Sequence, residues 1–483
     1  MKKIFRFLLI AVVSLIAIIA INTIRFNSRQ IATREERKSF PLDSAAVKHL
    51  SQAIQIRTIS YDDTSNTDYS TFDTLFVFLQ KTYPLAFADL NVERINRYGI
   101  LMHWKTGSQK KPVIFYAHMD VVPADSSTLS AWAYPPFAGM VDEQFVYGRG
   151  TIDDKGSVIA LLEAIEKLLK NNFRPSRDIF LAFGFDEEAT GLKGAKQIAD
   201  ELHRRGVKAE FLLDEGGLIA VDMVPFVKNP VALIATSEKG YMSLKLSVQG
   251  SGGHSSFPPK RPPVETLADA ITRIHDNPFP RRMSQSLNDF MDYAGPEMNL
   301  PFKAIFANRW LFKSIVFNEY EKIPSANAMI RTTSVTTIIH SGMKDNVIPT
   351  SASAIVNLRL LPGDDSGDVL KMLREIIGDT NVSVQTYGPV TEASQVSSTE
   401  AEGFALLQTT INKVFPDVVV TPSLLIGQTD SRHFRNVTEN IYRFLPVRMD
   451  DKILDSMHGM DEKIGVKEFM ESIAFYEEMI QAL

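Results

Sequence analysis

Short apolar runs alternate with segments of helical spacing from about residue 43 onward. In the first half of the chain, the runs predicted to be strands are residues 101–104, 113–117, 178–185 and 209–213. The segments predicted to be helices are residues 45–56, 71–80 and 157–169. Strands that alternate with helices indicate an α/β fold, in which a mostly parallel sheet is flanked by helices on both faces.

A second pattern begins near Ser237. Residues 242–248 alternate between apolar and polar side chains, which is typical of a strand with one wet face. The elements predicted after it are a helix at 264–274, strands at 333–340 and 352–360, a helix at 368–377 and a strand at 382–387. This order is typical of a split βαβ domain. We therefore expect a small α+β domain at residues 237–394, inserted into a larger one as a lid or dimerisation domain.

Residues 277–328 are too long for a simple connection, and their apolar content predicts packed helices. The α/β pattern resumes with predicted helices at 401–414 and 467–483. The larger domain is therefore expected to comprise residues 43–236 and 395–483.

The first 26 residues have a composition of their own. Three cations precede an apolar run at residues 7–24, which is interrupted only by Ser14, Asn22 and Thr23. At about 1.5 Å per helical residue this run can cross most of a hydrocarbon core. We expect a signal-anchor helix at residues 1–26 and a polar stalk at 27–42, with the rest of the chain on the extracytoplasmic side. The alternative is a cleaved signal peptide and a freely secreted protein.

Composition excludes some classes of site. The 483 residues are 45% hydrophobic and 23% charged, as in ordinary globular proteins, and the formal net charge is -5. This net charge gives no sign of a basic surface that would bind nucleic acid. The chain has no cysteine, which excludes disulfides and thiolate ligands for a metal.

Side chains that bind metals follow several apolar runs. His118 and Asp120 end the run at 113–117, and carboxylate pairs follow at 153–154, 187–188 and 214–215. The C-terminal ends of parallel strands meet at one edge of a sheet, so these side chains can converge there. Imidazole nitrogen and carboxylate oxygen are suitable ligands for divalent cations. Each pair alone could be a solvated or glycine-rich turn, but the set predicts a metal site.

Eight short motifs occur in a fixed order between about Ser51 and the C-terminus. They are residues 118–123, 148–156, 186–188, 213–216, 253–256, 346–349, 427–432 and 458–462. Together they resemble the co-catalytic di-zinc amidohydrolases and peptidases that include aminoacylase, glutamate carboxypeptidase and carboxypeptidase S. The N-terminal apolar segment and the long insert resemble the subgroup of carboxypeptidase S and the secreted N-acyl-amino-acid hydrolases.

The resemblance implies two Zn²⁺ ions per chain, with Co²⁺ or Mn²⁺ as alternatives. The implied metal ligands are His118, Asp153, Glu188, Asp214 and His458. Asp153 would bridge the two ions, and the peptide bond after it would be cis. Asp214 is preferred to Glu215 because it directly follows the apolar strand, but the choice between these adjacent acids stays open.

Other residues are implied to act on the substrate. Glu187 would be the general base for the attacking water, and Asp120 would orient His118 by accepting a hydrogen bond from its ring. His254 would stabilise the oxyanion, often from a partner subunit. The remaining implied substrate-binding residues are Asn346 and Arg432. An arginine suits a carboxylate because its planar fork can donate two parallel hydrogen bonds.

The implied reaction is hydrolysis of an amide bond next to a free carboxylate, by a carboxypeptidase or an N-acyl-amino-acid hydrolase. The substrate would be a short peptide or an N-acyl amino acid, and the chain would form a homodimer through its small domain. The alternatives are a strict dipeptidase or a desuccinylase on the same scaffold. A non-catalytic membrane-tethered binding module is the alternative from another class.

Overall fold

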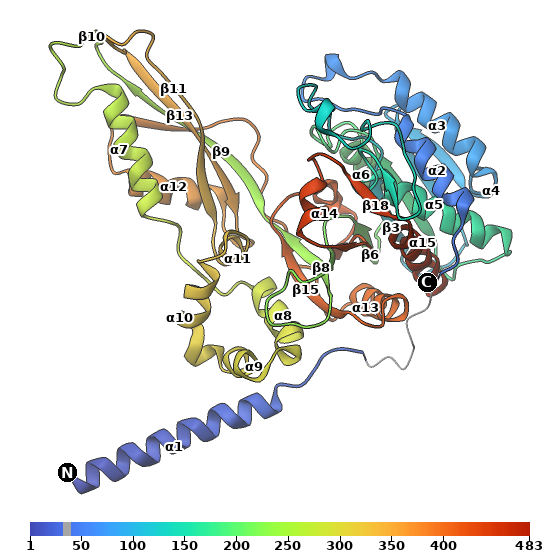
Figure 1. Cartoon of the computed structure of the whole chain (residues 1–483), viewed down its shortest axis with the longest axis horizontal. Coiled ribbons are helices and arrows are strands. Elements are labelled where there is room, and N and C mark those ends of the chain that lie inside the picture. Colours follow the sequence, from blue (N-terminus) through green and yellow to red (C-terminus); the bar gives the residue numbers. More distant parts are fainter. Residues whose placement is uncertain (32–39) are drawn as a thin grey trace.

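The computed structural model describes residues 1–31 and 40–483 (Figure 1). Within these residues the largest sheet has ten strands. Along the sheet they are β1 (Asn91–Ile95), β2 (Gly99–Trp104), β5 (Ile179–Gly184), β3 (Val113–His118), β6 (Phe211–Asp214), β16 (Ile441–Arg443), β8 (Val231–Glu238), β7 (Leu218–Ala220) and β17 (Arg448–Met449), with β15 (Val419–Leu425) paired to β8. The neighbours β5, β3, β6 and β16 are parallel. Because β1, β2 and β7 add antiparallel pairs, the sheet is mixed.

Strand β3 is buried on both faces. Val113, Phe115 and Ala117 belong to one core, and Ile114 and Tyr116 belong to another. The first core is completed by α2 (Ser44–Gln55), α3 (Ser70–Thr82), α4 (Pro84–Asp89), α5 (Lys155–Lys170), α13 (Glu402–Val414) and α15 (Val466–Gln481), and the second by α6 (Ala195–Arg204) and the 3₁₀ helix Asp430–Asn436. An unbroken apolar run fits a strand covered on both sides. The expected α/β fold is therefore confirmed.

A second sheet forms a separate layer with its own core. Its antiparallel strands are β11 (Thr333–Ser341), β13 (Ser351–Leu360), β9 (Gly240–Gln249) and β14 (Val382–Thr386). Helices α7 (Pro263–Asp276) and α12 (Ser366–Ile377) pack on it through residues such as Leu267 and Leu373. At the end away from the large sheet, β10 (Gly253–His254) pairs with β12 (Val347–Ile348) (Figure 1).

The long segment between α7 and β11 is helical, as expected. It contains α8 (Gln285–Ala294), α9 (Leu300–Ala307), α10 (Arg309–Tyr320) and α11 (Pro324–Ile330). Its apolar core includes Leu287, Met291 and Phe306 and reaches Leu233 of β8. The segment thus packs against the large sheet beside β8 and β15 (Figure 1).

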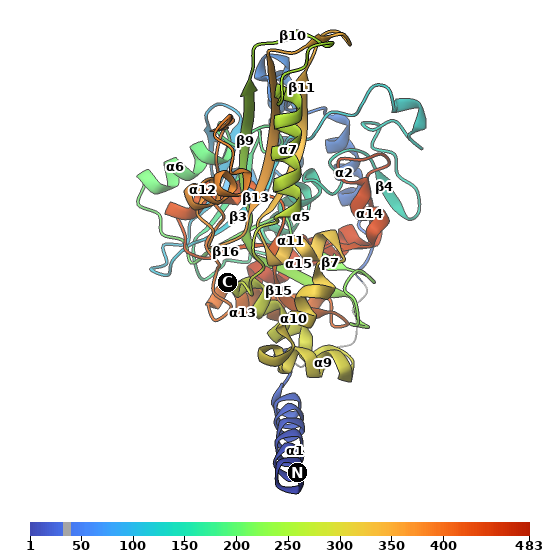
Figure 2. The ribbon, with the colours of Figure 1, turned by 90° about the vertical axis from the view of Figure 1, so that its left-hand side faces the viewer.

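Helix α1 (Lys2–Arg25) projects from the body beside α9, and both views place α9 at its C-terminal end (Figures 1 and 2). It is long and apolar enough to cross a membrane, and its apolar window is not buried. Residues 32–39, most of the expected stalk, lie outside the described residues.

A short two-stranded sheet joins residues 145–147 to residues 463–465. Strand β4 (Phe145–Tyr147) pairs antiparallel with β18 (Lys463–Gly465), and helix α14 (Asp451–Ser456) precedes the latter. This pairing holds the chain before Asp153 next to the chain after His458.

Candidate metal centre

Strands β5, β3 and β6 are neighbours in the sheet, so their C-terminal ends form one edge. His118 is the last residue of β3, Glu187 and Glu188 follow β5, and Asp214 ends β6. The structure therefore brings residues that are distant in sequence to a common edge, where parallel α/β sheets carry their sites.

Asp153 lies between two groups of side chains. Its Oδ1 is 2.9 Å from Nε2 of His118, and its Oδ2 is 3.0 Å from Nε2 of His458. Oε1 of Glu215 is 3.2 Å from the same nitrogen of His118, and Oε2 of Glu188 is 3.1 Å from the same nitrogen of His458. Asp153 thus offers one carboxylate oxygen to each of two donor sets.

Overlapping groups of these side chains, one of them with Asp154, have the spacing of ligands for divalent cations. His118, Asp153 and Glu188 place ligand atoms within 4.8 Å of one another, as do His118, Asp154 and Glu215. Burial raises the pKa of Glu215 to about 8, and the charge of Asp153 acts in the same direction. Metal cations among these acids would offset that electrostatic cost, and imidazole with carboxylate is a donor set that suits Zn²⁺. The residues present therefore fit two metal ions with Asp153 between them.

The adjacent acids Asp214 and Glu215 point in different directions. Glu215 faces His118, whereas Oδ2 of Asp214 accepts a hydrogen bond from the backbone N–H of Ser431 at 3.1 Å. Among the described residues, Asp214 belongs to neither metal-ligand group. Glu215 therefore faces the candidate metal ligands, whereas Asp214 faces the loop that carries Ser431.

Asp120 supports both His118 and the turn that carries the two glutamates. Nδ1 of His118 is 3.0 Å from the backbone oxygen of Asp120 and 3.4 Å from its Oδ1. The Asp120 carboxylate accepts hydrogen bonds from the backbone N–H groups of Glu187 at 3.2 Å and Glu188 at 3.1 Å. It also accepts a hydrogen bond from the hydroxyl of Ser60 at 2.5 Å. These bonds direct Nε2 of His118 toward the other ligands and hold the glutamate turn beside them.

Glu187 lies beside the ligand cluster. Burial raises the pKa of Glu187 well above its ordinary value; the charge of His118 opposes this shift, and the carboxylates of Asp430 and Glu215 add to it. A general base works best when its pKa lies near the working pH, so a raised pKa suits a glutamate that takes a proton from water.

Glu462 holds the loop that carries Asp153. Its Oε1 accepts hydrogen bonds from the backbone N–H groups of Gly150 at 2.9 Å, Ile152 at 3.0 Å and Asp153 at 3.3 Å. The Glu462 side chain is fully buried. The peptide bond between Asp153 and Asp154 is cis, as expected.

Glu462 also connects to Arg149. Nη1 of Arg149 is 2.5 Å from Oε2 of Glu462, and Nη2 donates to the carbonyl oxygen of Gly459 at 2.7 Å. Glu462 was not among the predicted site residues. Its place four residues after His458, within the same motif, was the available signal.

Arg432 ties two loops together beside the site. Its Nη1 donates to the carbonyl oxygen of Thr429 at 2.6 Å, and its Nη2 donates to that of Thr190 at 3.0 Å. The side chain is 16% exposed. A substrate carboxylate at Arg432 would have to compete with these backbone hydrogen bonds.

Strand β10, which contains His254, lies at the far end of the small sheet (Figures 1 and 2), and Asn346 directly precedes its partner β12. His254 is in β10, which pairs with β12, and the backbone N–H of Ser255 donates to the carbonyl oxygen of Asn346 at 3.2 Å. Both residues are exposed. The structure does not bring them to the metal ligands of the same chain.

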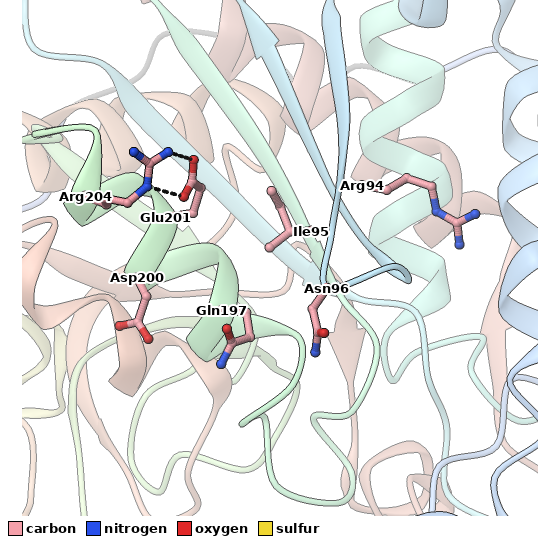
Figure 3. Close-up of a pocket in the computed structure, with 7 residues that line it drawn as sticks. All are labelled: Arg94, Ile95, Asn96, Gln197, Asp200, Glu201 and Arg204. Atoms are coloured by element: carbon pink, nitrogen blue, oxygen red, sulfur yellow. Dashed lines mark hydrogen bonds and ion pairs between the residues drawn. The ribbon is translucent and has the colours of Figure 1, made fainter.

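A surface hollow of about 340 Å³ lies elsewhere, between the end of β1 and α6 (Figure 3). It is lined by Arg94, Ile95, Asn96, Gln197, Asp200, Glu201 and Arg204. Arg204 and Glu201 form an ion pair there, and the guanidinium of Arg94 points away from it (Figure 3). None of the candidate metal ligands lines this hollow.

Residues 114–482 match the sequence model of peptidase family M20/M25/M40. The chain belongs to this family. It is 37% identical over 491 residues to "Probable carboxypeptidase S-like 2" of Dictyostelium discoideum. That alignment covers 99% of this chain and 93% of the relative. The chain is also 37% identical over 442 residues to "N-fatty-acyl-amino acid synthase/hydrolase PM20D1" of Bos taurus, which covers 89% of this chain and 86% of the relative.

A solved structure has the same fold. The M20 family metallo-carboxypeptidase Sso-CP2 from Sulfolobus solfataricus superposes with a TM-score of 0.67 at 19% identity, covering 91% of this chain and 99% of that one. The family and the expected subgroup are confirmed, and the chain is an M20 enzyme of the metallopeptidase and amidohydrolase type.

Proposed function

We propose that this protein hydrolyses N-acyl amino acids at the amide bond next to their free carboxylate. The observation that carries the proposal is the placement of Asp153 between two His–Glu donor sets. The likeness to a relative named for hydrolysis of N-fatty-acyl amino acids supports this substrate class. Removal of a C-terminal residue from short peptides is the second candidate, supported by the relative named carboxypeptidase S-like.

Two Zn²⁺ ions per chain are the proposed cofactors. His118 and Glu215 would hold one ion and Glu188 and His458 the other, with Asp153 shared between them. When bound, such ions polarise a carbonyl group and make water more acidic.

Glu187 is the proposed proton carrier. The attacking water forms a bond to the carbonyl carbon while the Glu187 carboxylate accepts one of its protons. The carbon–nitrogen bond then breaks as Glu187 passes that proton to the leaving nitrogen. The backbone of its turn donates two hydrogen bonds to the Asp120 carboxylate, so Glu187 need not be repositioned between the two transfers.

A second copy of the chain is the proposed source of His254 and Asn346. Both lie on an exposed tip of the small sheet, away from the ligands of their own chain. In a symmetric dimer this tip can reach the other subunit's site, where an imidazole can stabilise the oxyanion. We retain Arg432 as a candidate for the substrate carboxylate, after exchange of its bond to Thr190.

Helix α1 is the proposed membrane anchor, with the catalytic part on the extracytoplasmic side. Its length, its apolar composition and the cations in its first turns support this arrangement. Cleavage and secretion are the alternative, and N-terminal sequencing of the mature protein separates the two.

The test is hydrolysis profiling of the full-length, zinc-loaded protein in detergent. The panel contains N-acyl amino acids of different acyl length, short peptides with a free C-terminus, and the amide-capped form of each. We expect the highest kcat/KM for N-acyl amino acids and poor turnover of the capped forms. Glu187→Gln should retain its metal and lose about 10²–10⁴-fold in kcat. Hydrolysis of peptides alone would favour the second candidate, and hydrolysis of neither class would contradict both.

A further inference from the structure

Two polar residues near the end of α1 contact the body of the protein. Nδ2 of Asn22 donates to Oδ1 of Asn308 at 2.9 Å, and Nδ2 of Asn308 is 3.3 Å from Oγ1 of Thr23. Asn308 lies between α9 and α10, and both Asn308 and Thr23 are buried. Asn22 and Thr23, which interrupt the apolar run of α1 near its end, therefore have partners in the fold.

The chain after α1 continues this contact. Phe26 packs against the apolar core of α8–α11. Nε2 of Gln30 donates to the carbonyl oxygen of Val420 at 2.9 Å, and the Val420 N–H donates back to Oε1 of Gln30 at 2.8 Å. The Arg29 guanidinium lies over the Tyr293 ring at 5.2 Å. The end of α1 is thus fitted to the body, so its position relative to α9 is defined.

The length of α1 indicates where along the helix the outer surface of a bilayer would lie. Residues 7–21, the part of the apolar run that precedes the contact at Asn22, would span about 22 Å as a helix. The hydrocarbon core of a bilayer is about 30 Å thick, so this segment has no length to spare. If α1 spans the bilayer, the outer surface must lie near Asn22, at the level of α9 (Figures 1 and 2).

Large apolar side chains are exposed at that level. Leu300 of α9 is 71% exposed and Trp310 of α10 is 59% exposed. Trp310 is only two residues from Asn308, which binds α1. Phe226, 50% exposed, stacks on Phe302 of α9 with ring centroids 3.5 Å apart. Gathered apolar side chains with a tryptophan beside a membrane helix suit the interfacial zone of a bilayer.

We propose that α9, α10 and Phe226 form a membrane-contact surface that rests in the outer leaflet of a phospholipid bilayer beside α1. The proposal rests on the proposed anchoring by α1. The body would then be held by two contacts, the spanning helix and this surface. A second contact limits the tilt of the body relative to the membrane, because packing contacts and interfacial anchors set the tilt of a spanning helix.

The test uses tryptophan fluorescence of the full-length protein in phosphatidylcholine vesicles. The chain has 3 tryptophans, of which Trp104 is 2% and Trp132 is 9% exposed. Lipids brominated in the upper part of the acyl chain should quench Trp310 and spare the two buried residues. Trp310→Phe should therefore abolish the quenching, whereas Trp132→Phe should retain it. Leu300→Glu should weaken it, and Val77→Glu, at a position 44% exposed on the distant helix α3, should not.

Flotation of the vesicles separates this proposal from the anchor. Protein that floats with the vesicles but shows no quenching by brominated lipid would overturn the membrane-contact surface and leave the anchor intact. Trp310 shielded from lipid and from aqueous iodide alike would also overturn it, in favour of contact with a second copy. Protein that does not float would overturn the anchor and this proposal together.

Discussion

The Asp153 N–H donates to the Glu462 carboxylate at 3.3 Å, and the same oxygen accepts the N–H groups of Gly150 and Ile152. One buried carboxylate thus shapes the loop that presents the residue between the two donor sets. Because Arg149 is its ion-pair partner, loss of the charge on Glu462 leaves a buried guanidinium uncompensated.

We expect Glu462→Gln to lower the free energy of unfolding by about 3 kcal/mol, since breaking one side of a buried ion pair is strongly destabilising. It should also release zinc to a chelator faster than the unmodified protein does. Urea unfolding and chelator competition measure the two effects. Glu477→Gln is the matched control, because its partner Lys167 is exposed and such pairs contribute about 1 kcal/mol or less. Equal stability of the two variants would contradict the role of Glu462.

A second prediction separates the adjacent acids. Glu215→Gln should lower the zinc content by about one ion per chain, because it removes a ligand of one metal only. Asp214→Asn should retain both ions, since its carboxylate binds the Ser431 backbone. Elemental analysis of both variants after zinc loading and dialysis provides the comparison. Loss of metal from Asp214→Asn but not from Glu215→Gln would restore the sequence-based preference.

The sequence could not decide whether Asp214 or Glu215 is the metal ligand. Consecutive residues at a strand end point to opposite sides, and the sequence alone does not say which side faces the site. The strand itself was predictable, because its unbroken apolar run fits burial on both faces. The same reasoning predicted β3 with His118 at its end.

Other features depend on partners far away in sequence. Strands β8 and β15 were not predicted, although they pair in the large sheet. Pro422 within β15 and the polar end Thr236–Glu238 of β8 weaken the local strand pattern. Asn22 likewise interrupts an apolar helix without any local reason, and only its bond to Asn308 explains it.

The proposed dimer predicts complementation between two inactive variants. His254→Ala lacks the imidazole and Glu187→Gln lacks the base, so each should be nearly inactive alone. In a mixed dimer, the His254→Ala subunit would receive His254 of the partner subunit and regain one working site. After mixing in equal amounts with subunit exchange, about a quarter of the unmodified activity should return. No recovery, despite verified mixed dimers, would show that His254 does not act across subunits.

Lys239 provides a prediction about pH. It joins β8 to β9, and its Nζ donates to the carbonyl oxygens of Ala328 and Arg331, each at 2.9 Å. Burial lowers the pKa of Lys239 from 10.5 to about 7; the charge of Arg359 adds to this shift and Asp364 opposes it. Between these two values the unfolded chain binds more protons than the folded one. Lys239 therefore makes the folded state more stable as the pH rises through this window.

We expect Lys239→Met to reduce the rise of unfolding free energy with pH between about pH 7 and about pH 10, by at most about 1.4 kcal/mol per pH unit. Urea unfolding across this range measures the slope. Lys371→Met, at an exposed position of α12, should leave the slope unchanged. Identical slopes for the two variants would contradict the lowered pKa of Lys239.

Asp153 is proposed to lie between two metal ions held by His118, Glu215, Glu188 and His458. Anomalous X-ray diffraction from crystals of the zinc-loaded protein, recorded on both sides of the zinc absorption edge, tests it most directly. We expect two peaks, one on each side of the Asp153 carboxylate, separated by about 3.5–4 Å. A single peak, or peaks that do not contact Asp153, would contradict the claim.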